Sequence, residues 1–130
     1  MIQHIIDNIF LGDYQDAQYN NIHFEDIFTV AKDSPYIGNH HYPLIDAYSI
    51  DNEELLYSAI YDLIITREQK NSNILVHCIA GLSRSPTVVA GYMIIKKGYD
   101  INGALWYIKN IRPLANPNPE LTRLLERLYI

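Results

Sequence analysis

The chain has 130 residues, of which 48% are hydrophobic and 19% charged, and its formal net charge at pH 7 is −5. This length predicts a single domain over residues 1–130, with enough apolar mass for a core and no apolar run long enough to cross a bilayer. The acidic balance argues against nucleic acid or an anionic membrane as the main partner, because both require a broad cationic surface.

Three segments in the first third of the chain have the pattern of strands. Asn8–Gly12 is predicted as a short strand closed by glycine, and Asp13 is placed to cap a short helix after it. The apolar run Ile27–Ala31 has the length of a strand and is followed by turn residues. Tyr42–Ile45 is a third strand candidate, in which Pro43 indicates a sheet edge or a strand start because proline cannot donate to a ladder.

From Asp51 the hydrophobic spacing changes to that of a helix. Asp51 and Glu54 resemble a capping box at its start. One face of this helix is marked by apolar residues: Leu55, Leu56, Ala59, Ile60, Leu63 and Ile64. The run Ile74–His77, rich in apolar and β-branched residues, then predicts a strand buried on both faces.

Three further helices are expected after that strand. Pro86–Lys97 has proline in its first turn and a glycine placed to end it. A second helix is defined by apolar residues between positions 104 and 111, with Asp100 or Asn102 as its cap. Asn118-Pro119 opens the last one.

Alternating strands and helices predict an α/β fold, with a mostly parallel central sheet of four to five strands flanked by helices. In such sheets, ligand sites form beyond the carboxyl ends of the strands. Cys78 directly follows the strand Ile74–His77 and is therefore placed at such an end.

The segment from Cys78 to Ser85 contains what is needed to bind and attack a phosphate. Its successive backbone amides can converge on an anion, Gly81 allows a positive φ, and the next helix points its N-terminus into the same cavity. Arg84 offers a planar guanidinium for bidentate contact, and this positive field favours the nucleophilic thiolate of Cys78. Ser85 is placed either to cap the helix or to donate to the Cys78 sulfur. The predicted phosphate-binding residues are Ile79, Ala80, Gly81, Leu82, Ser83 and Arg84.

Each of these residues also has a simpler interpretation. A lone cysteine is most often a small buried hydrophobe, and His77 has the pattern of a satisfied core histidine. The coincidence of His, Cys, Gly, Arg and Ser at this spacing has a chance probability of about one in ten thousand in so short a chain. The joint pattern therefore favours phosphate chemistry.

His77–Ser85 resembles the signature loop of the protein tyrosine phosphatase superfamily: His-Cys, two residues, Gly, two residues, Arg, then Ser or Thr. Pro86–Met93 and Ile9–Ala17 are similar to the dual-specificity branch, whose last connection is echoed by Arg112-Pro113 and residues 117–119. The resemblance implies a protein tyrosine phosphatase-like fold. It also implies hydrolysis of phosphotyrosine and phosphoserine/phosphothreonine in proteins through a phosphocysteine intermediate, with no cofactor.

The proton donor for the leaving group must come from outside the signature loop, because the loop contains no carboxylate. Asp51, Glu53 and Glu54 are explained by the start of a helix, where acids are favourable. Asp46 follows an apolar segment and opens a loop. The resembled family places its acid just before the helix that precedes the signature loop, which implies Asp46, and Asp51 is the alternative.

The variable loop positions carry no charge, whereas relatives that act on phosphoinositides tend to carry lysines there. A single phosphate on a protein is therefore the expected substrate, and the alternatives are RNA 5′-phosphates, phosphoinositides, or phosphate binding without catalysis. No metal is expected, because His40 and His41 would point to opposite faces of a strand. Since Cys78 is the single cysteine and no secretory signal is visible, we expect a reducing compartment, cytoplasmic or nuclear.

Overall fold

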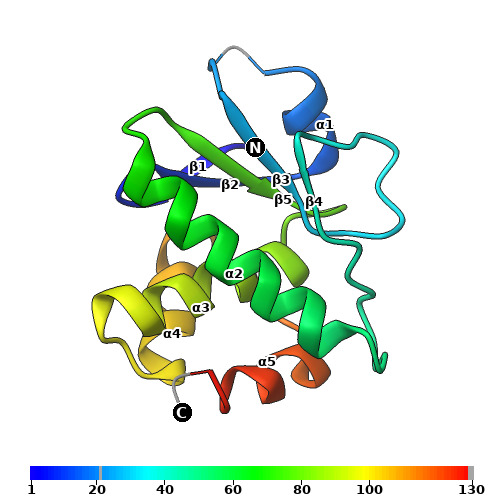
Figure 1. Cartoon of the computed structure of the whole chain (residues 1–130), viewed down its shortest axis with the longest axis vertical. Coiled ribbons are helices and arrows are strands. Elements are labelled where there is room, and N and C mark those ends of the chain that lie inside the picture. The colour runs from blue at the N-terminus through cyan, green and yellow to red at the C-terminus, as the bar shows by residue number, and fades with distance from the viewer. Residues whose placement is uncertain (21, 129–130) are drawn as a thin grey trace.

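One five-stranded sheet organises the computed structural model, which describes residues 1–20 and 22–128 (Figure 1). In chain order the strands are β1 (Gln3–Ile6), β2 (Ile9–Gly12), β3 (Asp26–Thr29), β4 (His40–His41) and β5 (Ile74–His77). Their order across the sheet is β1-β2-β5-β3-β4, and all neighbours are parallel except the β1–β2 hairpin. The expected α/β fold with a mostly parallel central sheet is confirmed.

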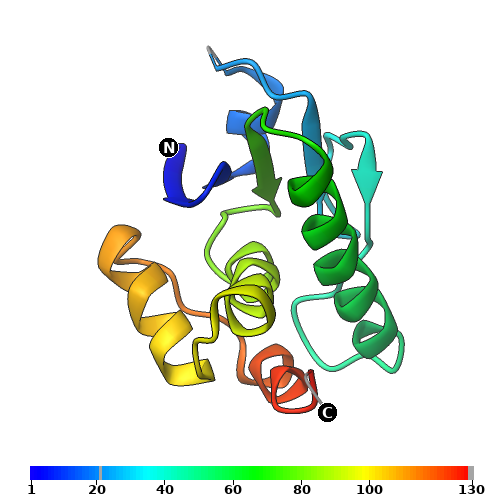
Figure 2. The same cartoon turned by 60° about the vertical axis from the view of Figure 1, so that its left-hand side comes forward.

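Helices cover both faces of this sheet unequally, as two views of the chain show (Figures 1 and 2). They are α1 (Tyr14–Gln18), α2 (Asn52–Gln69), α3 (Arg84–Lys97), α4 (Ile101–Ile111) and α5 (Pro119–Leu125). Helices α2, α3, α4 and α5 gather on one face and α1 packs on the other. Among the described residues, no helix is both long and apolar enough to span a membrane.

The side chains of β5 show how the sheet separates two cores. Ile74 and Val76 pack into the main core against α2 and α3, whereas Leu75 points to a smaller cluster with Ala17 and Phe24. This alternation is the normal consequence of the strand period of two. Because all four residues of β5 are buried, the strand is fixed from both sides and holds the chain that follows it in place.

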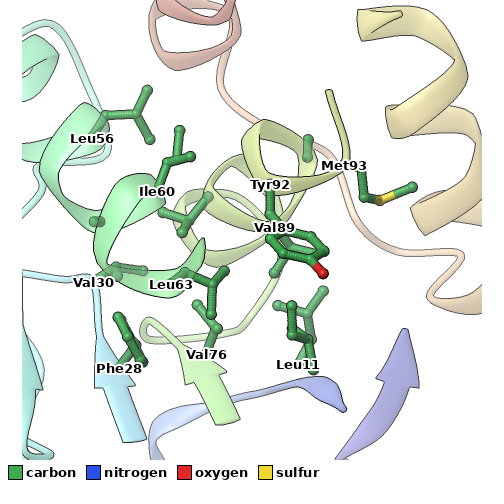
Figure 3. Packing of buried hydrophobic residues seen from close by; sticks show 14 of the residues in the cluster. Leu11, Phe28, Val30, Leu56, Ile60, Leu63, Val76, Val89, Tyr92 and Met93 are labelled. Atoms are coloured by element: carbon green, nitrogen blue, oxygen red, sulfur yellow. The ribbon is translucent and has the colours of Figure 1, made fainter. Parts of the chain in front are cut away.

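The main core is built where α2 crosses α3 above the strands (Figure 3). Ile60 and Leu63 of α2 face Val89 and Tyr92 of α3 in this view. Gly91 permits the close approach, because a Cβ at that position would collide with the Ile60 side chain. The helix that begins after the signature loop is therefore packed firmly behind that loop.

The carboxyl ends of the parallel strands lie together at one edge of the sheet. His77 of β5 is in register with the last residues of β2 and β3. Cys78 follows β5 at this edge, and the loops that follow β3 and β4 carry Asp33 and Asp46. The topology thus collects these three side chains from segments far apart in sequence.

Most of the predicted helix boundaries are confirmed. Asp13, Asp100 and Asn118 each accept a hydrogen bond from a backbone N–H at the start of α1, α4 and α5, respectively. Asp100 rather than Asn102 is thus the cap of α4. Gly98 ends α3 with a φ of 75°, as the sequence predicted.

The strand predicted at Tyr42–Ile45 is wrong, since β4 comprises only His40 and His41. Pro43 has no N–H, and the N–H of Leu44 turns back to the carbonyl of Tyr42, so the ladder ends before them. The sequence prediction also missed β1, which pairs with β2 through a tight turn at Asp7.

The capping box predicted from Asp51 and Glu54 is also wrong. Asp51 has helical backbone angles, φ −82° and ψ −15°, and its side chain makes no capping hydrogen bond. A capping side chain requires an extended backbone at that position, so the geometry excludes it. The buried Asn52 fixes this end instead, because its side chain donates to the carbonyls of Ile45 and Ala47 and accepts from the Ile45 N–H.

Candidate active site

A cleft of about 430 Å³ opens at the carboxyl edge of the sheet. Its walls come from the signature loop, from the segment after β4 and from the connection between α4 and α5. The lining residues are Asp46, Cys78, Ile79, Ala80, Leu82, Ser83, Arg84, Leu114 and Asn116. Of the residues to which the sequence assigned catalytic roles, Cys78, Arg84 and Asp46 therefore meet in one cavity.

Cys78 lies at the bottom of the cleft with 2% of its surface exposed. Its Sγ is 3.3 Å from the hydroxyl of the buried Ser85. The N-cap position of α3 belongs to Ser83, so Ser85 stands inside the first helical turn. Of the two roles left open for Ser85, the structure places its hydroxyl toward the sulfur.

Gly81 is required by the path of the signature loop. Its φ is 72°, in the left-handed region that side chains disfavour. A Cβ here would also collide with the carbonyl of Gly12 and lie only 2.7 Å from Nη2 of Arg112. The loop therefore turns tightly over the end of β2.

Arg84 lies behind the cleft with 6% of its surface exposed. Its Nη1 donates to Oδ1 of Asp33 at 2.6 Å and to the carbonyl of Leu44 at 3.0 Å. Its buried Nε has no hydrogen-bond partner among the described residues. The hydrogen bond from Arg84 lowers the pKa of Asp33 below its ordinary value, so this carboxyl is charged at neutral pH. Hydrogen bonds thus anchor one side of the guanidinium but not its Nε side.

Asp46 projects from an exposed loop onto the opposite wall of the cleft. The Ser83 hydroxyl donates to its Oδ1 at 2.6 Å, and the Asn118 side chain donates to its backbone carbonyl at 3.0 Å. The backbone N–H of Asn118 in turn donates to the Ser83 hydroxyl at 2.9 Å. Asp51, the alternative acid, instead lines a separate hollow beside Tyr42.

His77 contacts the backbone of Cys78 from inside the sheet. Its Nδ1 lies 2.9 Å from the carbonyl of Cys78, and its Nε2 lies 2.6 Å from the hydroxyl of Thr29. Burial lowers the pKa of His77, so the ring is neutral: Nδ1 donates and Nε2 accepts. The interpretation of His77 as a satisfied core histidine fits these contacts, and it also fixes the position of the Cys78 backbone.

The histidine pair at positions 40 and 41 shows no metal-binding arrangement. His40 lies between Asp26 and Asp62, with its ring nitrogens 2.7 and 2.8 Å from their carboxylates. His41 is directed toward the carbonyl of Ala31. In residues 1–20 and 22–128, no three His, Cys, Asp or Glu side chains form a group that could hold a metal ion.

Sequence reasoning missed several residues of the site. Asp33 was read only as part of a turn, although its place after a parallel strand was a usable signal. Asn118 was identified as a helix cap, and its second contact with the Asp46 loop depends on tertiary structure. No sequence signal identified Leu114 or Asn116 as lining residues.

Comparisons with known proteins agree with this geometry. Residues 9–129 match the family model described as "Dual specificity phosphatase, catalytic domain". Dual specificity protein phosphatase 1 of Arabidopsis thaliana is 36% identical over 77 residues, covering 59% of this chain and 39% of that protein. Protein-tyrosine-phosphatase IBR5 of Arabidopsis thaliana is 28% identical over 120 residues, covering 91% and 47%. The chain thus spans less than half the length of these two relatives.

A solved structure extends the likeness to three dimensions. The crystal structure of DUSP15 superposes with a TM-score of 0.81 and 27% sequence identity, covering 96% of this chain and 85% of that one. The sheet and the helices described above therefore follow an arrangement already seen in a solved structure.

Proposed function

The chain belongs to the dual specificity phosphatase family, and on this premise we propose that it hydrolyses phosphate monoesters of phosphotyrosine and phosphoserine/phosphothreonine in proteins. The observation that carries the proposal is the convergence of Cys78, Arg84 and Asp46 on one cleft. A nucleophile, an anion-binding cation and a proton donor are the three groups that this reaction requires without a metal.

In the first step, the Cys78 thiolate attacks phosphorus, an S–P bond forms, and the bond from phosphorus to the leaving oxygen breaks. Arg84 and the loop amides hold the nonbridging oxygens, whose negative charge must be stabilised throughout. Asp46 gives its proton to the leaving oxygen. The anchored Nη1 of Arg84 supports this role, because the buried Nε has no hydrogen-bond partner among the described residues and keeps its N–H for an anion.

In the second step, water attacks the phosphocysteine. Asp46, now a carboxylate, accepts a proton from the water, and the S–P bond breaks to release inorganic phosphate and the Cys78 thiolate. Ser85, with its hydroxyl 3.3 Å from the sulfur, stabilises the departing thiolate by hydrogen bonding. The chain would thereby return to its starting state with no cofactor consumed.

The lining of the cleft supports a single phosphate group on an otherwise neutral partner. Ile79, Ala80 and Leu82 face it from the loop, and Leu114, which is 77% exposed, stands at its rim. An apolar rim suits the side chains of a peptide better than the extra phosphates of an inositol lipid. A reducing compartment, cytoplasmic or nuclear, suits an enzyme whose nucleophile is its single cysteine.

A substrate panel tests the proposal. Phosphotyrosine and phosphoserine/phosphothreonine peptides, phosphoinositides and 5′-triphosphate RNA would be assayed with the wild type, Asp46→Ala and Cys78→Ser. We expect turnover of the phosphopeptides, slower turnover with Asp46→Ala, and none with Cys78→Ser. Preferred hydrolysis of the lipid or the RNA would overturn the protein substrate, and phosphopeptide binding without any turnover would indicate a non-catalytic module.

A further inference from the structure

Arg112 is a buried cation that the proposed reaction does not use. It follows α4 directly, and only 7% of its surface is exposed. Its Nε donates to the carbonyl of Gly81 at 2.8 Å, and its Nη2 donates to the carbonyl of Ala80 at 3.4 Å. Its Nη1 donates to the carbonyl of Met1 and to Oε1 of Gln3, both at 2.8 Å. One guanidinium thus ties the signature loop to the first residues of the chain.

These contacts determine which way the loop amides point. In a trans peptide the C=O and the N–H point in opposite directions, and no cis peptide is present among the described residues. A guanidinium that holds the carbonyls of Ala80 and Gly81 on the side away from the cleft turns the N–H groups of Gly81 and Leu82 toward it. Those two amides are part of the predicted anion nest.

The neighbouring peptides are held by backbone groups in the same manner. The N–H of Tyr14 donates to the carbonyl of Ile79 at 3.0 Å, and the N–H of Asn116 donates to the carbonyl of Leu82 at 2.8 Å. The carbonyls at 79 and 82 therefore depend on the main chain, whereas those at 80 and 81 depend on one side chain. The middle of the nest is the part that a single substitution can release.

We propose that Arg112 is a positioning residue, which aims the Gly81 and Leu82 amides at the substrate phosphate and is itself oriented by Gln3. The inference rests on the proposed function. All acceptors of the guanidinium are neutral oxygens, and among the described residues no carboxylate forms an ion pair with it. Its positive charge therefore also adds to the field that attracts an anion.

Lysine cannot replace this guanidinium, although it keeps the charge. The ammonium group is a single point donor, whereas Arg112 reaches the loop and the N-terminal segment with nitrogens that point in different directions. Arg112→Lys therefore separates geometry from charge. Arg123→Lys is a matched control, because Arg123 is exposed and its guanidinium forms, within the described part of the chain, a single ion pair, with Glu120 across 3.5 Å.

The test measures tungstate, a phosphate-like dianion, as a ligand and as a competitive inhibitor, together with kcat/KM for an aryl phosphate. We expect Arg112→Lys to lower tungstate affinity and kcat/KM by about 10- to 100-fold, since the loss of one oxyanion donor costs about 100- to 1,000-fold in kcat and here two amides are only loosened. Arg123→Lys should leave both unchanged. Guanidinium ion added to Arg112→Ala should restore part of the tungstate affinity.

Unchanged tungstate affinity in Arg112→Lys would overturn the proposal, and so would an equal loss in the Arg123→Lys control. If Arg112→Lys does not fold, Gln3→Met removes only one acceptor of the guanidinium and should weaken tungstate binding by about 2- to 5-fold, as expected for one partly exposed hydrogen bond. Unchanged tungstate affinity in Gln3→Met would also overturn the proposal. A wild type that binds tungstate but hydrolyses no phosphomonoester would refute the proposed function, and the affinity comparison would still test Arg112.

Discussion

The two walls of the cleft are held in place differently. The signature-loop wall, residues 77–85, is one continuous segment, and its Cys78, Arg84 and Ser85 are buried. The acid wall, residues 30–46, is a long connection through a strand of only two residues, and its Asp33 and Asp46 are exposed. Among the described residues, one backbone hydrogen bond, from the Val30 N–H to the His77 carbonyl, joins it to the opposite wall, together with the side-chain hydrogen bonds of Ser83 and Arg84.

This difference assigns separate tasks to the walls. A buried, cross-braced loop can hold donors in fixed positions around a phosphate, which is where electrostatic stabilisation is most effective. An exposed loop can approach and leave with each substrate, which suits a group that only exchanges protons. We therefore expect substitution of the buried Cys78 in the signature-loop wall to abolish the reaction, and substitutions of Asp46 and Asp33 in the acid wall to weaken it by different degrees.

The largest expected effect is that of Cys78→Ser. A serine hydroxyl at this position is hardly ionised at neutral pH, so kcat for an aryl phosphate should fall by about 10,000-fold or more, to the background rate. Initial rates measured with a folded variant check this. Substantial residual turnover would contradict the roles given to the two walls, because the nucleophile would then have to lie outside the signature-loop wall.

Asp46→Ala should have the next largest effect. General acid–base catalysis contributes about 100- to 10,000-fold, and the loss should be greatest for substrates whose leaving group most needs a proton. We expect kcat to fall in this way while tungstate affinity is kept. The loss of kcat is measured with a series of aryl phosphates whose leaving groups differ in basicity. Asp51→Ala is the control. An equal loss of kcat in Asp51→Ala would contradict the assignment of Asp46 as the proton donor.

Ser83→Ala cuts the bridge between the two walls. The Ser83 hydroxyl donates to Asp46 and accepts from the N–H of Asn118, so its removal frees the acid loop without touching the nucleophile. A hydrogen bond contributes about 0.5 to 1.5 kcal/mol, which corresponds to a loss of about 2- to 10-fold in kcat/KM. The same measurement in Ser83→Thr, which keeps the hydroxyl, should give a rate near that of the wild type. A full loss with threonine would exclude the hydroxyl as the cause.

Asp33→Ala should have a smaller effect. Asp33 anchors Nη1 of Arg84 at 2.6 Å, but its side chain is 65% exposed, and exposed ion pairs contribute at most about 1 kcal/mol. We expect KM for an aryl phosphate to rise about 2- to 5-fold, and Asp33→Asn, which keeps an acceptor for Arg84, to lose less. A lower KM in Asp33→Ala would mean that the carboxylate competes with the phosphate for Arg84.

Substitution of Asp26, at the β3–β4 edge, should have the smallest effect on activity. Its main effect should be on the stability of the fold in acid. Burial alone would raise the pKa of Asp26, but hydrogen bonds and charges from His40 and Lys70 bring it below 3.8. The stabilisation of the fold by these contacts is fully present above pH 3.8. It is lost as the pH falls through the lower pKa that Asp26 has in the folded state. His77 acts in the same direction below pH 6.5, because burial disfavours its protonation in the folded state.

Urea unfolding at a series of pH values therefore should show stability falling as the pH is lowered, first through His77 and then through Asp26. Asp26→Asn should cost about 1 to 3 kcal/mol at neutral pH and flatten the acid part of the curve, with little change in kcat. Stability that rises on acidification would contradict these assignments.

The same contrast explains what could be predicted from the sequence. The signature-loop wall is contiguous, so its residue types and spacing identified Cys78, Arg84 and Ser85 with their strand and helix. The acid wall depends on contacts between distant segments, which no local pattern encodes. Asp46 was predicted by elimination among the upstream carboxylates together with the resemblance, and Asp33 was missed.

The errors in the fold have a related cause. β1 and β4 lie at the edges of the sheet, and β4 has only two residues, so their pairing with a neighbour, rather than their own composition, defines them. At the start of α2, Asn52 captures backbone groups of Ile45 and Ala47, an arrangement that depends on the path of the preceding loop. The long helices carried clear periodic signals and the buried β5 carried a continuous apolar run, so these elements were found.

The central claim is that the phosphoryl group passes through Cys78, and a trapped intermediate tests it most directly. Asp46→Ala, mixed with an aryl phosphate that needs no proton donor and quenched in acid, should accumulate protein carrying one phosphoryl group. Peptide mass spectrometry should locate that group on Cys78, and Cys78→Ser treated in the same way should carry none. A phosphoryl group on another residue, or rapid turnover with no phosphorylated protein at any quench time, would contradict the account.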